Sequence, residues 1–243
     1  MCQRQWQQQR HAVTDTYGLR PVINVNFTAT VTGGNGTSND NFILEADKTT
    51  NVVNKSLKDT VTPGEYVKLN GKTYRVVSKN NDKVKLIYDG YYEEPAGTVF
   101  NMAYGTDNVF STTAGIGQKL NTAVLTYLGT DKIVESNWYQ KPFDYGNSYT
   151  VSLDETGTPV TSKVGLIRVG EMLSGQSATI SSKQHYWTLT PHTHASNAWI
   201  VYFDGHSGNN AVTDTNGLRP VINVNSTLTI TTGKGTPNSP YEI

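Results

Sequence analysis

The sequence predicts a β-rich α+β fold, and its composition, its turn signals and one helical pattern lead to that class. The 243 residues include 33 Thr and 22 Asn. Thr favours strands, whereas Asn and Gly favour tight turns, so the composition indicates strands joined by polar loops. Helical spacing is clear in only one stretch. We therefore expect a mostly antiparallel sheet, one or two helices and long loops.

The clearest local signals predict a three-stranded meander followed by one helix. The strands are expected at 66–69, 73–77 and 84–88, with turns at Asn70-Gly71 and at residues 80–82. Asn-Gly between two apolar runs predicts a hairpin, because both residues accept a positive φ. The helix is predicted from an apolar repeat every four residues with a glycine stop, at Ile116, Leu120, Val124, Leu128 and Gly129.

Short buried strands are expected in the rest of the chain. Their predicted positions are 164–169, 186–189, 197–203, 212–215 and 218–224. A Ser/Gly/Asn loop is expected between the third and fourth of these. Trp187 and Trp199 are expected to pack in the core, whereas Tyr186 and Tyr202 have the opposite parity and are expected to face outward.

One stretch of the chain occurs twice. Residues 12–44 and 211–243 align without a gap at an offset of 199 residues, and 21 of the 33 aligned positions are identical. A period this long is that of a whole domain and not of a solenoid repeat. We therefore expect residues 1–44 to be the tail of a preceding repeat copy, residues 45–63 a linker, and residues 64–243 a complete domain.

The first copy contains an apolar run that is typical of a strand. This run lies outside the expected domain, which a strand of this kind would normally complete. This expected assembly strand comprises Leu19, Val22, Ile23 and Val25. Arg20 and Gly18 flank it and recur as Arg219, expected to hydrogen-bond loop carbonyls, and Gly217, expected to supply a special backbone angle. An apolar strand has to be buried, either in its own chain or in a neighbour by strand addition. The sequence leaves both alternatives open.

The charge pattern and the length of the apolar runs exclude two classes of partner. The chain has 20 acidic and 20 basic residues and no block of like charge, which gives no electrostatic footprint for nucleic acid. No apolar run approaches membrane-spanning length, so no membrane insertion is expected. An uncharged, hydrogen-bonding surface is common outside the cell, which favours an extracellular or cell-surface location. The export signal would then lie upstream of this sequence.

A resemblance to C-type-lectin-like domains is carried by residues 186–224, YWTLTPHTHASNAWIVYFDGHSGNNAVTDTNGLRPVINV. The closest branch contains the formylglycine-generating enzymes and the variable proteins of diversity-generating retroelements. A similar ending recurs in uncharacterised surface proteins of Gram-positive bacteria. Two further stretches resemble other parts of those domains, GEYVKLNGKTYRVV and KVGLIRVGEML. The resemblance implies a compact domain with a twisted antiparallel sheet and a ligand face made by loops.

In the retroelement variable proteins, the ligand face is displayed by the segment before the closing strand. The resemblance places the equivalent face here at Tyr186, Thr188, Thr190, His192, His194, Asn197, Trp199, Tyr202, Asp204, His206, Asn209 and Asn210. Formylglycine-generating enzymes work through a cysteine pair, which the matched region lacks, so that activity is excluded. The Glu-Pro-Asn and Gln-Pro-Asp calcium motifs of sugar-binding C-type lectins are not found either.

Histidines and one Asp–His–Ser sequence raise the question of a metal or catalytic site. Four of the five histidines lie within 22 positions, at His185, His192, His194 and His206. No carboxylate or cysteine completes a recognisable zinc spacing, so we expect exposed contact residues and neither metal nor cofactor. Asp204, His206 and Ser207 are neighbours on a turn, which rarely allows triad geometry, and we expect no enzyme activity.

Two hypotheses of function follow. The first is a non-catalytic, adhesin-type binding module on a cell surface, whose loops before the closing strand bind a glycan or protein ligand. The second is a structural subunit of an extracellular filament that assembles by strand exchange through residues 12–44, with copies of itself or neighbouring repeats as partners. Both can hold for one adhesive filament.

Overall fold

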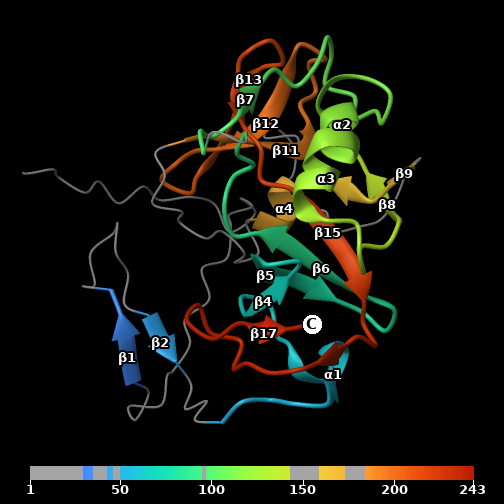
Figure 1. Ribbon diagram of the computed structural model, residues 1–243. Coiled ribbons are helices and arrows are strands. Elements are labelled where there is room, and N and C mark those ends of the chain that lie inside the picture. The colour runs from blue at the N-terminus through green and yellow to red at the C-terminus, as the bar shows by residue number, and fades with distance from the viewer. Residues whose placement is uncertain (1–29, 35–42, 46–49, 95–96, 143–158, 173–183) are drawn as a thin grey trace, which may run out of the picture.

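The computed structural model describes residues 30–34, 43–45, 50–94, 97–142, 159–172 and 184–243 (Figure 1). Over these residues the fold is rich in strands and has few, short helices, which confirms the predicted β-rich α+β class. Two larger sheets share one hydrophobic core with the longest helix. In Figure 1 the five-stranded sheet lies at the top of the view and the six-stranded sheet below it.

The strands of both sheets are mostly antiparallel. The six-stranded sheet has the order β10 (Val164–Gly165), β15 (Val221–Asn225), β6 (Lys83–Tyr88), β5 (Lys72–Lys79), β4 (Tyr66–Leu69) and β17 (Tyr241–Glu242). The five-stranded sheet has the order β13 (Ser207–Ala211), β12 (Asn197–Val201), β11 (Tyr186–Pro191), β14 (Asn216–Gly217) and β7 (Asn101–Met102). Only the β17–β4 and β11–β14 pairs in these two sheets are parallel.

Three smaller pairs complete the described strands. They are β3 (Lys55–Ser56) with β16 (Thr229–Ile230), β8 (Ser136–Tyr139) with β9 (Pro159–Ser162), and β1 (Thr30–Gly33) with β2 (Ile43–Glu45). Two short helices, α1 (Leu57–Thr60) and α4 (Val169–Glu171), connect strands.

The predicted helix and meander are confirmed. One continuous helix runs through α2 (Gly115–Lys119), the π-helical turn η1 (Leu120–Val124) and α3 (Leu125–Leu128). Its four apolar residues at spacings of four all face the core and are buried. Gly129 ends it with a φ of 80°. In the meander, Asn70 and Gly71 take φ values of 51° and 74°, as the turn between β4 and β5 requires.

The prediction of a linker at residues 45–63 is wrong for its described part, residues 50–63. β3 pairs with β16, and α1 follows directly. Leu57 and Val61 are fully buried in the core. Leu57 begins the helix and Val61 directly follows it, and together these two side chains attach an otherwise polar stretch to the domain.

The second copy of the repeat, residues 211–243, supplies strands to three sheets. It provides β15 and β17 to the six-stranded sheet, β14 to the five-stranded sheet and β16 to the pair with β3. In this copy Thr232 pairs with Glu242. At the repeat offset of 199, the equivalent pair in the first copy is Gly33 with Ile43, and β1 and β2 pair in that same register. The predicted assembly-strand residues Leu19, Val22, Ile23 and Val25 lie outside the described residues.

Candidate functional site

Part of the predicted ligand face is buried inside the five-stranded sheet. Tyr186 is only 3% exposed, so the expectation that it faces outward is wrong. Its ring lies 5.2 Å from the guanidinium carbon of Arg219. The Thr188 hydroxyl, fully buried, donates a hydrogen bond to the Trp199 carbonyl, 2.8 Å away. The predicted ligand role of these residues is wrong because β11 lies between β12 and β14 and is covered on both faces.

Thr190 and Trp199, also in the predicted face, are buried by helix α4. The Thr190 hydroxyl accepts a hydrogen bond from the Val169 amide at 3.0 Å, and Trp199 packs against the Val169 side chain. Trp187 is fully buried, and its indole N–H donates to the Met102 carbonyl at 2.8 Å. The prediction that both tryptophans pack in the interior is therefore confirmed.

The remaining predicted residues divide between the two ends of β12. His192, His194 and Asn197 lie at its start, whereas Tyr202, Asp204 and His206 lie at the turn after its end. Asn209 and Asn210 lie on β13, which forms where the Ser/Gly/Asn loop was expected. The Asn197 amide donates to the Asn209 side-chain oxygen at 2.8 Å, and that of Asn210 to Asn216 at 3.4 Å.

The loop at the start of β12 is held by a residue that the sequence did not indicate. The amide nitrogen of Asn108 lies within 2.8–3.1 Å of the backbone oxygens of His192, His194 and Asn197. Asn108 is buried, whereas His194 is exposed. The His192 and His194 rings stack with centroids 5.3 Å apart. At this end of the predicted face, the buried Asn108 side chain therefore holds the loop in place, and the exposed surface of the loop is polar.

At the other end of β12, four rings form what we call the aromatic turn: His185, Tyr202, Phe203 and His206. The Tyr202 and His206 rings stack at 4.5 Å, and His185 lies edge-on to Tyr202 at 4.7 Å. His185 also stacks against Phe203 at 5.8 Å. Phe203 is 51% exposed. The turn therefore presents aromatic surface to solvent.

Backbone and polar contacts fix the aromatic turn. Asp204 Oδ1 lies 2.5 Å from the His206 Nδ1 atom, and Gly205 takes a φ of 89° at the tip of the turn. A side chain at Gly208 would place its Cβ 2.3 Å from the Tyr202 ring, so only glycine lets that ring lie flat on β13. Phe203 and His185 were missed as site residues. Phe203 was assigned to the strand, which ends two residues earlier, at Val201.

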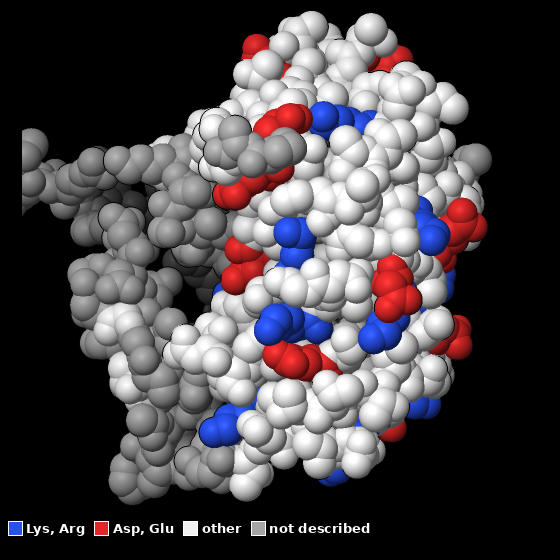
Figure 2. Space-filling model, in the orientation of Figure 1, with Lys and Arg blue, Asp and Glu red and all other residues white. Residues whose placement is uncertain are grey.

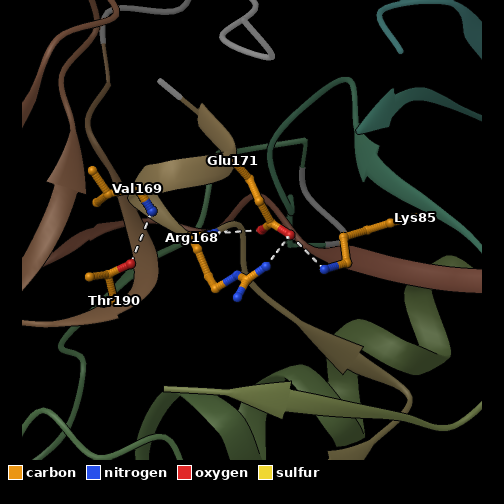
Figure 3. Close-up of polar contacts among 5 residues, drawn as sticks. All are labelled: Lys85, Arg168, Val169, Glu171 and Thr190. Atoms are coloured by element: carbon orange, nitrogen blue, oxygen red, sulfur yellow. Dashed lines mark hydrogen bonds and ion pairs between the residues drawn. The ribbon is translucent and has the colours of Figure 1, made fainter. Parts of the chain in front are cut away.

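An ionic network beneath this sheet joins it to the six-stranded sheet (Figure 3). The Glu171 carboxylate contacts Lys85 Nζ at 2.6 Å and an Arg168 guanidinium nitrogen at 3.1 Å, and its second oxygen accepts from the Arg168 backbone N–H. Burial alone would raise the pKa of Glu171, but the two cations outweigh it and lower that pKa below its ordinary value. Since Val169 bonds to Thr190 on β11, helix α4 links β6 to β11.

Gly217 and Arg219, both repeated in the chain, have structural roles. Arg219 is fully buried and donates from two guanidinium nitrogens to the Tyr88 carbonyl at 3.1 and 3.2 Å. The predicted carbonyl acceptor thus lies at the end of strand β6 and not in a loop. Gly217 has no positive φ, so the predicted reason for that glycine is wrong. A Cβ there would lie 2.7 Å from the Tyr91 ring, and close packing is the reason instead.

The described residues include no group of three or more His, Cys, Asp or Glu side chains that could bind a metal ion. Among the described contacts, Ser207 makes no hydrogen bond to the His206 ring, although Asp204 does contact that ring.

None of the helices in the described ranges combines the length and apolar character needed to cross a membrane. Basic and acidic side chains are interspersed over the largely uncharged face in Figure 2.

Comparison with protein-family models, with curated proteins and with solved structures finds no match for this chain. The structure itself therefore defines the class of protein, as a β-rich α+β domain with an exposed aromatic turn.

Proposed function

We propose that the protein is a non-catalytic, extracellular binding module of the C-type-lectin-like class, which recognises a glycan through its aromatic turn. The resemblance of residues 186–224 supports the class and the location. One observation carries the ligand-binding role: four rings pack against one another at a solvent-exposed turn, with Phe203 half exposed. Rings fixed in advance offer contact area without a large loss of side-chain entropy on binding.

The size of the apolar surface favours a glycan over a protein ligand. A stable protein interface buries roughly 800 Å² on each partner around an apolar centre. Of the exposed large hydrophobic residues in the described part, namely Val31, Val53, Val109 and Phe203, only Phe203 belongs to the aromatic turn. The exposed Phe203 ring, which stacks on His185 and is followed by Asp204, suits the flat apolar face and hydroxyl edge of one sugar ring.

Phe203→Ala is expected to weaken glycan binding by about tenfold or more, since the exposed ring supplies the stacking surface. The free energy of unfolding should fall by only about 1 kcal/mol, because the ring is already half exposed. A glycan array identifies the ligand, and calorimetry compares the variants. Val109→Ala, at another exposed apolar residue, is the control and should bind like the unmodified chain. Equal binding by Phe203→Ala, or capture of a protein instead of any glycan, would contradict the proposal.

A second candidate function is assembly by strand complementation through residues 12–44, as in a filament. The shared register of the two hairpins favours it: Gly33 pairs with Ile43 as Thr232 pairs with Glu242. The first copy also repeats the side chains that the second copy buries in the core, namely Val212, Leu218, Val221, Ile222 and Val224. A segment with these features can complete the sheets of a related domain.

Two differences between the copies indicate which domain the first copy would complete. Asn216 and Ser226 are buried, and Ser226 donates a hydrogen bond to the Asn81 carbonyl. The equivalent residues in the first copy are Tyr17 and Phe27, which are much larger. The partner is therefore a neighbouring repeat with room at these two positions and not an identical copy of this chain.

Replacing Tyr17 with asparagine and Phe27 with serine in the full chain is expected to create oligomers by strand exchange. The first copy would then carry the same small residues as the second copy at the two buried positions, which have no room for a large side chain. Sizing chromatography and electron microscopy should show a monomer for the unmodified chain and larger species for the double variant. Filaments of the unmodified chain would show exchange between identical copies instead, and a monomeric double variant would argue against strand exchange.

A further inference from the structure

The six-stranded sheet carries a polar pocket, whereas the aromatic turn follows a strand of the five-stranded sheet. Its volume is about 250 Å³. The pocket is lined by side chains from β5, β6, β8, β15 and the turn between β5 and β6: Ser78, Lys79, Asn80, Asp82, Lys83, Lys85, Ser136, Asn137, Tyr139 and Asn223. Every lining residue is polar or charged, which is unusual for a concave surface built on a sheet.

A row of polar side chains crosses three strands at the base of the pocket. Ser78 pairs with Lys85, and Lys85 pairs with Asn223, so these three residues lie on one face of the sheet. The row exists because β5 has a bulge between Val76 and Ser78. With regular pairing, Val77 would lie opposite Lys85. The bulge places a hydroxyl there instead, and bulges often aim side chains in this way beside binding sites.

Asn223 presents a side-chain amide to the pocket. Its side chain is only 5% exposed and lines the pocket, yet its amide makes no hydrogen bond among the described contacts. The amide atoms are not buried themselves, so they face the open space of the pocket, where water or a ligand can bond to them. Its two donors and its acceptor are available to a molecule in the pocket.

Two ammonium groups beside Asn223 are held in place with N–H groups to spare. Lys85 Nζ contacts Glu171, and Lys83 Nζ donates to the Glu135 carbonyl at 2.8 Å and to the Ser136 hydroxyl at 2.9 Å. Since each ammonium has three N–H donors, two remain at Lys85 and one at Lys83. The pocket thus offers an excess of donors and positive charge, with Asp82 as the one acidic lining residue.

We propose that this pocket binds a small acidic monosaccharide, whose carboxylate or phosphate lies between Lys83 and Lys85 and whose hydroxyls bond to Asn223 and Ser78. Charge-assisted hydrogen bonds to an oxyanion are stronger than neutral ones. The volume is below the roughly 300–1,000 Å³ of pockets for drug-sized ligands, which fits one sugar ring. This site does not depend on the aromatic turn, which lies on the other sheet.

The test is calorimetric titration of the full chain with four probes: glucuronate, glucose 6-phosphate, glucose and inorganic phosphate. Saturable binding of glucuronate or glucose 6-phosphate, at least tenfold tighter than that of glucose or inorganic phosphate, is expected. Lys83→Met and Asn223→Leu should each weaken it by roughly tenfold or more, since each removes a direct hydrogen bond. Lys55→Met, at an exposed lysine on β3, should leave it unchanged.

The two acidic probes separate a carboxylate ligand from a phosphate ligand. The proposal is overturned if neither acidic sugar binds, or if glucose or inorganic phosphate binds as tightly as the two acidic sugars. It is also overturned if Lys83→Met and Asn223→Leu bind the acidic sugars like the unmodified chain. Thermal unfolding of each variant establishes that a loss of binding is not a loss of folding. Lys83→Met serves as the second variant if Asn223→Leu, in an interior strand, does not fold.

Discussion

Replacing Glu171 with glutamine is expected to lower the free energy of unfolding at pH 7 by about 3–5 kcal/mol. The carboxylate contacts both Lys85 and Arg168 in a buried setting, and its removal takes away the anion that both cations face. The same change weakens the link between the two sheets, because the Glu171 carboxylate also accepts from the Arg168 backbone N–H at the start of α4. Urea unfolding followed by tryptophan fluorescence measures the difference.

The pH dependence of this contribution has a definite sign. The pKa of Glu171 is lower in the folded chain than in the unfolded chain. Its contribution to stability is therefore fully present above the unfolded value of roughly 4.3, and it is lost as the pH falls through the lower folded value. The difference between the unmodified chain and Glu171→Gln should accordingly shrink as the pH falls below about 4.

Glu94→Gln is the matched control for this prediction. Glu94 also pairs with a lysine, Lys119, at 3.2 Å, but 43% of its side chain is exposed. A pair exposed to this degree contributes less than about 1 kcal/mol. Equal effects of the two substitutions would contradict the structural importance of the buried network.

Transferring Tyr17 and Phe27 of the first repeat copy into the second, as Asn216→Tyr and Ser226→Phe, is expected to destabilise the domain by about 3 kcal/mol or more. Each change inserts a large ring at a buried position, and such overpacking costs about 1–3 kcal/mol per site. Ser226→Phe also removes the hydrogen bond to Asn81. Chemical unfolding of the double variant measures the sum.

Ile230→Val is the control, since it too transfers a residue of the first copy, Val31, to a buried position. It removes one methyl group and should cost about 0.5–1.5 kcal/mol. If the double variant were as stable as this control, the positions of Asn216 and Ser226 would accept the larger residues of the first copy. Exchange between identical chains would then become the preferred form of assembly.

Local signals explain which parts of the fold could be predicted. The helix follows from Ile116, Leu120, Val124 and Leu128, whose spacing matches the helical turn. The first hairpin follows from Asn70-Gly71. Neither prediction needed knowledge of distant residues.

The errors occurred where distant residues decide the outcome. Alternation along β11 predicted an outward Tyr186, but Arg219 lies against its ring and every residue of β11 is buried. Polar composition predicted a loop at 207–210, although these residues pair along β12. The polar pocket could not be foreseen either, since the bulge at Val77 that aims Ser78 leaves no mark in the sequence pattern.

The distribution of residues 211–243 over three sheets has a consequence for how the chain folds. β15 lies between β6 and β10, so the six-stranded sheet is divided until this segment is in place, and β14 likewise separates β7 from β11. The pairing of β15 with β6 joins residues more than a hundred positions apart, as in the pair of Val221 with Ile87. Contacts this distant slow folding, and the unpaired edges of earlier strands stay accessible meanwhile. During synthesis, the domain can therefore gain its native order only after residues 211–243 have left the ribosome.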